Sequence, residues 1–412
     1  MSKLPLLAVV YDRGSAGAVE IVASARKLCS VVLVVDESLP GAAGTARQLG
    51  ELAQVLDITG MSPEEAAAAL SALEVRGIVT FSEHRLAATA ELAAASGLPF
   101  HTPDVVTGLV DKQRQRARLH AAGVQSTRCE AVRSVDDVPQ AAARVGLPAV
   151  LKPRSGAGSV NTCRVDDLAQ LTATAEEFMA DGGAEYVLEE LLVGDPDGAG
   201  AGFGDYVSVE SVTSGGVVHH VCVTGKLPLA EPFRETGMFQ PASLSPALRS
   251  EVLALTEASI HALGITGGVT HVEIKLTPHG PRLIEVNGRM GGYVGALLRR
   301  SARFDLLRAA LREALSLPVE LPELSFPAVE YVYFVTPPAD AGQTLTALHG
   351  LADVAALDGV WQVKAEAAEG RSLDWRNGTE GHLGTVHGTA ADHDRLRATI
   401  AAIESTIVLE SA

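Results

Sequence analysis

The chain has 412 residues, of which 47% are hydrophobic and 20% are charged. This balance predicts an ordered globular protein with roughly two to four domains or lobes. The formal net charge of −17 argues against a general nucleic-acid binder, because such proteins need clustered Lys and Arg to displace counterions. Any phosphate-binding site in this chain should therefore be local.

The cysteines and the hydropathy pattern indicate a cytoplasmic protein. The segment 4–10 is too short for the core of a signal peptide, and no later stretch reaches about 18 uninterrupted apolar residues. We therefore expect no membrane association. The four cysteines are far apart and form no C-x-x-C pair, which favours a reducing compartment and small buried thiols over a zinc ribbon. They are Cys29, Cys129, Cys163 and Cys222.

The first third of the chain alternates between strand and helix patterns. Continuous apolar runs rich in β-branched residues predict buried parallel strands, and segments with helical spacing separate them. Ser62 is placed to cap a helix that has Pro63 at its first position. We expect a doubly wound parallel sheet with strands over 6–11, 31–35 and 77–81 and helices over 14–28, after 62 and over 83–95.

The pattern changes after residue 102. A helix expected over 107–122 carries Lys112 in a basic stretch, and a later strand carries Lys152 at its edge. Directly after that strand comes the sequence Arg-Ser-Gly-Ala-Gly-Ser, 154–159, whose backbone N–H groups could cover phosphates. Small Gly/Ser turns are usually only hairpins. A phosphate-binding role for this loop is therefore supported by the order of these parts and by the strand pattern that follows at 186–194.

The most informative feature is a strand pattern that reads Arg-Leu-Ile-Glu-Val-Asn-Gly-Arg and ends at Arg289. Alternate side chains of a strand share a face, so Glu285 and Asn287 point the same way. If Glu273 lies on an adjacent antiparallel strand, it adds a third oxygen ligand for Mg²⁺, which would keep waters and take phosphate oxygens. A solvated strand face is the alternative, but the flanking apolar residues favour a buried strand. The pattern predicts a site for nucleoside triphosphates.

A basic helix, a strand with a lysine, a glycine loop, a hinge strand and an acidic strand pair follow one another in this chain. In this order they resemble the ATP-grasp superfamily over roughly residues 100–320, and the N-terminal α/β region resembles the domain that precedes the grasp lobes. The resemblance implies that Lys112 and Lys152 bind the nucleotide phosphates. The loop residues that would cover the phosphates are Ser155, Gly156, Gly158 and Ser159.

The same resemblance places adenine against the backbone of the hinge strand. An acidic residue further along the chain would bind the ribose hydroxyls. A glycine-rich insert interrupts this step, so Asp205 is the best candidate, with Asp195 and Asp197 as alternatives. The residues that would line the base are Glu189, Glu190 and Leu192.

The metal ligands and the reactive groups also follow from the resemblance. Arg289 would contact the transferred phosphate and the developing negative charge, and it shares the catalytic role with Lys152. His271 lies on the Glu273 face, where it either touches substrate or phosphate or is a hydrogen-bonded, partly buried histidine. The implied metal ligands are Glu273, Glu285 and Asn287.

Within the superfamily, the acidic strands and the C-terminal segment most resemble the branch of L-amino acid ligases and carnosine-synthase-like enzymes that form dipeptides. In that branch, the segment equivalent to 227–241 lies near the substrates, although a merely structural loop is the alternative here. The candidate substrate-binding residues are Glu231, Arg234, Glu235, His271, Arg289, Gly291 and Gly292.

The expected architecture is an α/β chain with an ATP-grasp fold. It comprises an N-terminal doubly wound parallel domain, two α+β grasp lobes and a small antiparallel C-terminal cap in which Trp361 and Trp375 pack rather than bind ligand. A strand is expected over 329–335 in this cap. The expected regions are the N-terminal domain at 1–105, the small lobe at 106–205, the large lobe at 206–320 and the cap at 321–412.

The expected function is that of an ATP-dependent carboxylate–amine ligase. ATP with Mg²⁺, which Mn²⁺ could replace, would convert a carboxylate to an acyl phosphate, and an amine would then form an amide with release of ADP and phosphate. The partners would be two small molecules, with a dipeptide or an antibiotic amide as product, and the chain could form a homodimer. Two alternatives are a biotin-carboxylase-like enzyme that uses carboxyphosphate and a non-catalytic nucleotide-binding regulator.

Overall fold

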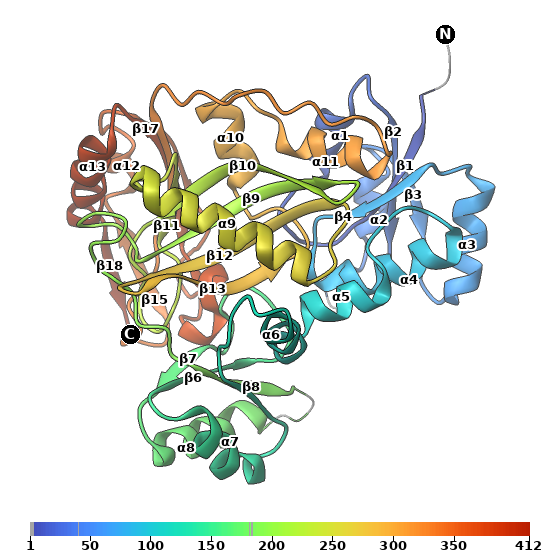
Figure 1. Cartoon of the computed structure of the whole chain (residues 1–412). Coiled ribbons are helices and arrows are strands. Elements are labelled where there is room, and N and C mark those ends of the chain that lie inside the picture. The colour runs from blue at the N-terminus through green and yellow to red at the C-terminus, as the bar shows by residue number, and fades with distance from the viewer. Residues whose placement is uncertain (1–3, 40, 181, 183) are drawn as a thin grey trace.

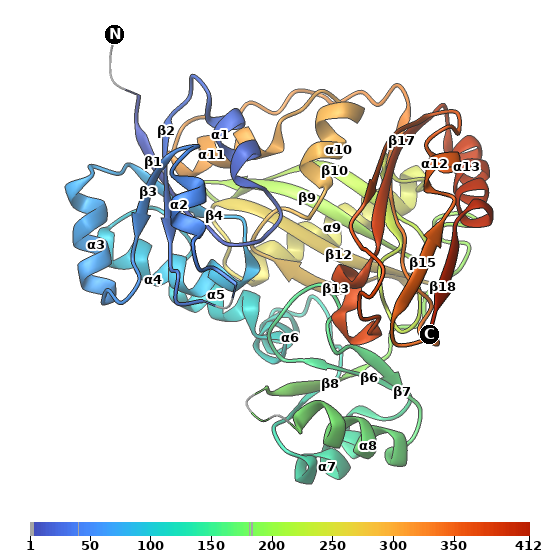
Figure 2. The ribbon, with the colours of Figure 1, turned by 180° about the vertical axis from the view of Figure 1, so that it is seen from behind.

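The computed structural model describes residues 4–39, 41–180, 182 and 184–412. Figure 1 shows a large central lobe with the N-terminal domain on one flank and the C-terminal region on the other, while a small lobe projects below. Figure 2 shows the same arrangement from behind, with helix α6 (Lys112–Ala121) between the N-terminal domain and the small lobe. The N-terminal domain, the small lobe and the central lobe are therefore distinct bodies in space.

The N-terminal domain is a parallel sheet, as expected, and its strand order is β3-β2-β1-β4. Leu7 and Val9 of β1 face a core that includes α1 and the distant helix α11 (Leu306–Ala314), whereas Ala8 and Val10 face the core shared with α3 and α4. Ser62 caps α3 as expected, since its Oγ accepts from Glu65 N at 3.2 Å. The strands are β1 Leu6–Val10, β2 Ser30–Val35, β3 Gln54–Asp57 and β4 Gly77–Thr80, and the helices are α1 Ala18–Ala25, α2 Thr45–Leu49, α3 Pro63–Ala72, η1 Glu83–Arg85 and α4 Leu86–Ser96.

The expected single helix over 107–122 is wrong. The structure has two helices, α5 (Pro103–Val110) and α6, which are separated by Asp111 in an extended conformation with φ −102° and ψ 106°. The Asp111 carboxylate accepts from Arg114 N at 3.1 Å and so caps α6. A short acidic side chain satisfies the first N–H groups of a helix better than it fits a helix interior. The break places Lys112 on the first turn of α6.

The small lobe is an antiparallel sheet in the order β5-β8-β6-β7, with α7 and α8 packed on its lower face (Figure 1). The glycine-rich loop connects β6 to β7 and contacts the start of α6, since Lys112 N donates to the Arg154 carbonyl at 3.0 Å. The elements are β5 Cys129–Val132, η2 Val135–Asp137, α7 Val138–Val145, β6 Ala149–Pro153, β7 Cys163–Val165, α8 Leu168–Met179 and β8 Tyr186–Glu190.

The large lobe and most of the C-terminal region share one antiparallel sheet in the order β13-β12-β9-β10-β11-β14-β17-β16. The C-terminal region is antiparallel as expected, but three of its strands extend the large-lobe sheet, because β14 pairs with β11. Residue 320 therefore does not separate two sheets, and the limits of the four regions stay a prediction. The strands are β9 Tyr206–Ser214, β10 Val217–Lys226, β11 Gly237–Gln240, β12 Gly268–Thr277, β13 Gly280–Asn287, β14 Val329–Phe334, β16 Val360–Ala365 and β17 Gly384–Ala390.

The remaining elements cover this sheet or lie at its margin. Strands β15 (Leu345–His349) and β18 (Val408–Ser411) form a separate pair. None of the helices in the described part of the chain combines the length and the apolar character needed to span a bilayer. All four cysteines are free thiols. The other helices are α9 Pro246–Ala262, α10 Val294–Ser301, α12 Leu351–Val354, η3 Trp375–Gly381 and α13 His393–Thr406.

Candidate active site

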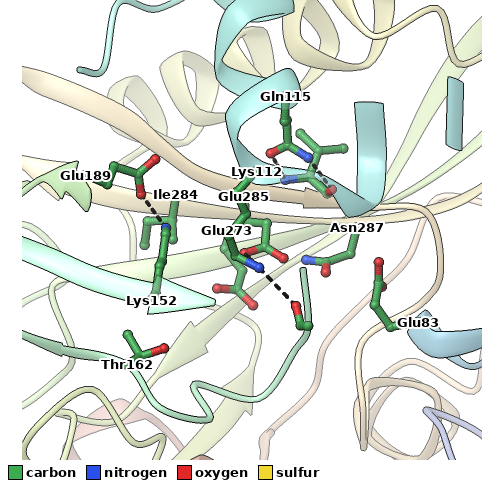
Figure 3. A network of polar contacts seen from close by, with 12 residues as sticks. Glu83, Lys112, Gln115, Lys152, Thr162, Glu189, Glu273, Ile284, Glu285 and Asn287 are labelled. Atoms are coloured by element: carbon green, nitrogen blue, oxygen red, sulfur yellow. Dashed lines mark hydrogen bonds and ion pairs between the residues drawn. The ribbon is translucent and has the colours of Figure 1, made fainter. Parts of the chain in front are cut away.

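Strands β12 and β13 bring the acidic residues together as the sequence predicts. The two strands pair antiparallel, with Glu273 directly opposite Glu285 and His271 opposite Asn287. Directly opposed residues of an antiparallel pair project from the same face, and Figure 3 shows the two carboxylates and the Asn287 amide close together. The register shifts just after Glu273, where Ile274 pairs with Leu283. The paired carboxylates therefore lie beside a local irregularity of the ladder.

The donors of this face suit a hard divalent cation. Among the described residues no cluster of three or more His, Cys, Asp or Glu is placed to hold a metal ion, so a cation here needs the Asn287 oxygen besides Glu273 and Glu285. The Asn287 amide nitrogen donates to the His271 carbonyl at 3.3 Å, and the amide oxygen accepts from Arg289 Nη2 at 3.4 Å. Oxygen donors completed by water and phosphate are what Mg²⁺ prefers. Metal binding by these three residues stays a prediction.

Lys112 connects the acidic strands to the glycine loop. Its Nζ lies 3.4 Å from Glu285 Oε2 and donates to the Gly156 carbonyl at 3.0 Å (Figure 3). The side chain is buried. Gly156 and Gly158 have φ values of 134° and 71°, which favour glycine, and Ser159 also lies in the left-handed region at 58°. The Lys112 ammonium group thus lies where the glycine loop meets the acidic strands.

Lys152 also lies beside the acidic strands (Figure 3), but it is held by a different carboxylate. Glu189 on β8 forms ion pairs with both Lys152 and Arg116, and all three side chains are buried. Burial alone would raise the pKa of Glu189, but the two cations lower it to about 2. Arg116 also donates to the Ile284 carbonyl. Glu189 therefore links Lys152 to α6, and Arg116 joins α6 to β13.

The adenine and ribose assignments stay predictions. Glu190 projects to the opposite face of β8 from Glu189 and lies 3.2 Å from Arg128, while Leu192 follows the end of the strand. Asp205 is bonded to Lys275 Nζ at 2.6 Å. The chain returns on itself across the glycine-rich insert, because a Cβ at Gly194 would lie 1.8 Å from an Asp205 oxygen. The carboxylate is therefore beside the end of the hinge segment.

Arg289 has a counterion that the sequence did not reveal. Its Nε lies 3.1 Å from Glu83 Oε2, and its Nη2 donates to Asn287 Oδ1 at 3.4 Å. Glu83 begins η1, directly after strand β4 of the N-terminal domain. Burial and the nearby Glu285 raise the pKa of Glu83, whereas Arg289 opposes this shift. Glu83 follows the carboxyl end of a parallel strand, the place where α/β sheets bind ligands. This position was the sequence signal that could have identified Glu83 as a site residue.

His271 lies between two carboxylates. Its Nδ1 bonds to Glu210 on β9, and its Nε2 lies 3.2 Å from Glu273 Oε1. Burial disfavours the charged ring, but Glu210 and Glu273 raise the pKa of His271 to about 9. Glu210 also accepts from Gly291 N at 3.3 Å, and a Cβ at Gly291 would lie 2.5 Å from the imidazole. His271 thus orients Glu273, with both ring nitrogens occupied by carboxylates.

The expected substrate segment forms an ion pair with a buried lysine that directly precedes it. Lys226, which the sequence did not single out, lies at the end of β10 and has Nζ 2.5 Å from Glu235 Oε1. Arg234 is 2% exposed, and it donates to the carbonyls of Glu231 at 2.8 Å and Pro337 at 2.7 Å. Arg234 therefore holds the segment, whereas the Glu231 side chain is exposed. Gly292 has open space where a Cβ would project.

Comparisons with known proteins agree with this geometry. No protein-family model matches the chain. Human carnosine synthase 1 is 30% identical over 275 residues, which cover 61% of this chain and 32% of the human protein. Alanine–anticapsin ligase from Bacillus subtilis is 27% identical over 235 residues, which cover 53% and 49%. The crystal structure of L-amino acid ligase from Bacillus licheniformis matches with a TM-score of 0.79 and 19% identity over 100% of both chains.

These likenesses establish the fold. The chain has the ATP-grasp fold, and the expected resemblance to the amino acid ligase branch is confirmed by its sequence relatives. The matched chain spans about a third of carnosine synthase and about half of alanine–anticapsin ligase.

Proposed function

We propose that this ATP-grasp protein, a relative of the amino acid ligases, is an ATP-dependent carboxylate–amine ligase that forms an amide or peptide bond and releases ADP and phosphate. The observation that carries the proposal is the in-register pair Glu273 and Glu285, with Lys112 and Arg289 at its edge. Three regions far apart in the sequence supply these groups and Glu83. Such convergence of carboxylates, an amide and cations suits a metal-bound polyphosphate.

The chain's own residues would bind the nucleotide in two ways. Lys112 and Lys152 lie where they can neutralise phosphate oxygens, and the 155–159 loop, through Ser155, Gly156, Gly158 and Ser159, can cover these oxygens with its N–H groups. Glu273, Glu285 and Asn287 would hold Mg²⁺, or Mn²⁺ in its place. When bound, the ion would offset the charge of the phosphates. Glu189, Glu190 and Leu192 would lie along adenine, and Asp205 would bind the ribose.

The reaction would proceed in two steps. A substrate carboxylate oxygen attacks the γ-phosphorus of ATP, the bond to ADP breaks, and an acyl phosphate forms. The amine then attacks the acyl carbon, and the tetrahedral oxyanion collapses to the amide with loss of phosphate and a proton. Arg289 can serve both steps, because its planar guanidinium suits phosphate oxygens and an oxyanion alike. A closed glycine loop would keep water from the acyl phosphate.

The substrates would be amino acids or related small molecules. The names of the relatives point to carnosine, to alanine with anticapsin and to L-amino acids, so a dipeptide or an antibiotic amide is the proposed product. Glu235, paired with buried Lys226, is the candidate contact for an amino group. His271 would act by orienting Glu273. We further propose that the protein works in the cytoplasm, with a homodimer as a state that sedimentation can test.

A phosphate-release screen tests this function. Pairs of amino acids are mixed with the protein and Mg-ATP, and mass spectrometry identifies any amide. Glu285→Ala and Arg289→Ala should abolish turnover with an unchanged circular dichroism spectrum, while Glu257→Ala on the exposed face of α9 should match the parent protein. Near-normal turnover in either site variant would contradict the site. Consumption of bicarbonate with free biotin, or nucleotide binding without turnover on any pair, would support one of the two alternatives.

A further inference from the structure

Helix η3 of the C-terminal region lies against the glycine loop of the small lobe. Figures 1 and 2 both show this orange-red segment at the upper end of the small-lobe strands. Two backbone hydrogen bonds join the segments: Thr379 N donates to the Gly158 carbonyl at 2.8 Å, and Asn161 N donates to the Arg376 carbonyl at 3.0 Å. The loop assigned to the phosphates is therefore held from outside its own lobe.

Gly378 makes this close approach feasible. A Cβ at this position would lie 2.0 Å from the Gly158 carbonyl oxygen and 2.7 Å from the Ser159 carbonyl carbon. Both contacts are with backbone atoms, so no side-chain movement could relieve them. Gly378 also has φ 61° and ψ −145°, a conformation that side chains disfavour. Only glycine fits between the two segments.

Two side chains at the start of η3 extend the contact to α8. The ring of Trp375 packs on Phe178 of α8 at 6.1 Å between centroids, and Arg376 forms an ion pair with Glu177 on the same helix. These contacts bind η3 to the small lobe beyond the loop itself. Trp375 therefore lies at the joint between the C-terminal region and the small lobe, where its fluorescence can report on opening.

Thr379 has a second partner on the opposite side. Its Oγ1 accepts from the backbone N–H of Glu235 at 3.2 Å, and Glu235 in turn pairs with buried Lys226. One residue thus contacts the glycine loop through its main chain and the proposed substrate segment through its side chain. Movement of the loop and placement of the Glu235 carboxylate are linked at Thr379.

We infer that Thr379 is a positioning residue, and that η3 holds the glycine loop closed over ATP in register with the Glu235 segment. The inference rests on the proposed ligase function. Closure of this loop would exclude water from an acyl phosphate. Loss of the contact should therefore weaken ATP binding and let the intermediate hydrolyse, so that ADP is released without an equal amount of amide.

The first test compares Gly378→Ala with Gly381→Ala. Gly381 lies in the same segment, and a Cβ there would meet nothing closer than 3.6 Å, so its variant controls for an added methyl group. Gly378→Ala should raise the KM for ATP roughly tenfold, as the loss of one backbone hydrogen bond implies, and should raise the ratio of ADP to amide. Hydrogen exchange at the Asn161 amide should become faster. Unchanged exchange at Asn161 would overturn the inference.

The second test separates the two contacts of Thr379. Thr379→Val removes the acceptor for Glu235 N but keeps the main-chain bond to Gly158, so it should raise the KM for the amino substrate several-fold and leave the KM for ATP unchanged. Thr379→Ser should restore the parent values. A rise in both KM values, or no rescue by serine, would contradict a positioning role.

A readout without turnover distinguishes failure of this inference from failure of the ligase function. The chain has two tryptophans, so Trp361→Phe leaves Trp375 as the sole reporter. In that background Gly378→Ala should shift the Trp375 emission to longer wavelength, while Gly381→Ala should not. These spectra and the exchange at Asn161 need no substrate. Identical spectra in both variants would contradict a contact between η3 and the small lobe that depends on Gly378, even if amide formation were demonstrated.

Discussion

Glu83 Oε2 of the N-terminal domain lies 3.1 Å from Arg289 Nε of the large lobe. Asn287 Oδ1 accepts from Nη2 of the same guanidinium at 3.4 Å. The arginine proposed to meet both phosphate and oxyanion is therefore oriented by two lobes at once. The N-terminal domain does more than cover the sheet, because it supplies the charge that fixes this group.

Replacement of Glu83 tests that orientation. Glu83→Gln keeps the shape but removes the counterion, so Arg289 loses its fixed position. We expect kcat to fall by roughly 10- to 100-fold, with the KM for ATP within about twofold of the parent, because Lys112 and Lys152, which we propose bind the phosphates, are untouched. Steady-state kinetics measure both values, and Glu91→Gln on the exposed face of α4 is the control. An unchanged kcat would show that Arg289 needs no help from Glu83.

Glu189 should be a major determinant of stability. Glu189→Ala leaves Arg116 and Lys152 as buried, unpaired cations, and loss of one partner of a buried ion pair costs about 3–5 kcal/mol in the free energy of unfolding. Glu190→Ala removes only a half-exposed pair with Arg128, worth up to about 1 kcal/mol. Urea denaturation compares the two variants. Equal losses would contradict the buried network.

Gln115 should hold β13, which carries two of the proposed metal ligands, in place. Its side-chain oxygen accepts from Val286 N at 3.0 Å and its nitrogen donates to Val286 O at 2.9 Å, so it satisfies the open edge of β13. Gln115→Met leaves the buried Val286 N–H and carbonyl without hydrogen-bond partners. It should therefore lower the free energy of unfolding by about 2–4 kcal/mol. It should also weaken Mg-ADP binding in calorimetry. Gln113→Met, two residues earlier, is the control, and a similar loss in both would refute the bridge.

Local patterns predicted the parts of the site that lie within single strands and loops. The alternation of Glu285 and Asn287, and the antiparallel partner Glu273, follow from period-two geometry and a short connection. The parallel N-terminal sheet follows likewise from buried apolar runs. Asp111 showed the limit of periodicity, because a single capping side chain broke a helix that the pattern had made continuous.

Contacts between distant segments could not be predicted in this way. Glu210 faces His271 only because β9 pairs with β12 in one particular register, and a shift by one residue would turn it to the opposite face. In the sequence, Lys226 is a lysine at the end of a strand and nothing distinguishes it. Its role becomes visible only when the fold brings Glu235 beside it. The C-terminal strands joined the large sheet through β11, whose four residues give a weak pattern. Non-local pairing decided each of these cases.

Glu313 on α11 provides a pH-dependent contribution to stability. With His101, it lines a cavity of about 240 Å³ between the N-terminal domain and the large lobe. Burial raises the pKa of Glu313 from its ordinary value of 4.5 to about 7, against the opposing effect of the Gly268 N–H. The native state therefore keeps a proton that the unfolded chain releases. This contribution is complete below pH 4.5 and is lost as the pH rises through 7.

Glu313→Gln tests the sign of this effect, because glutamine keeps an acceptor for Gly268 N but does not ionise. The free energy of unfolding of the variant minus that of the parent should be about 1–2 kcal/mol larger at pH 8 than at pH 5, after allowance for solvent screening. Urea denaturation at both pH values gives this difference, and titration of His101 cancels because both proteins contain it. Glu320→Gln on the exposed segment that follows should show no such change. A difference that is the same at pH 5 and pH 8 would mean that Glu313 is already ionised in the native protein at pH 5.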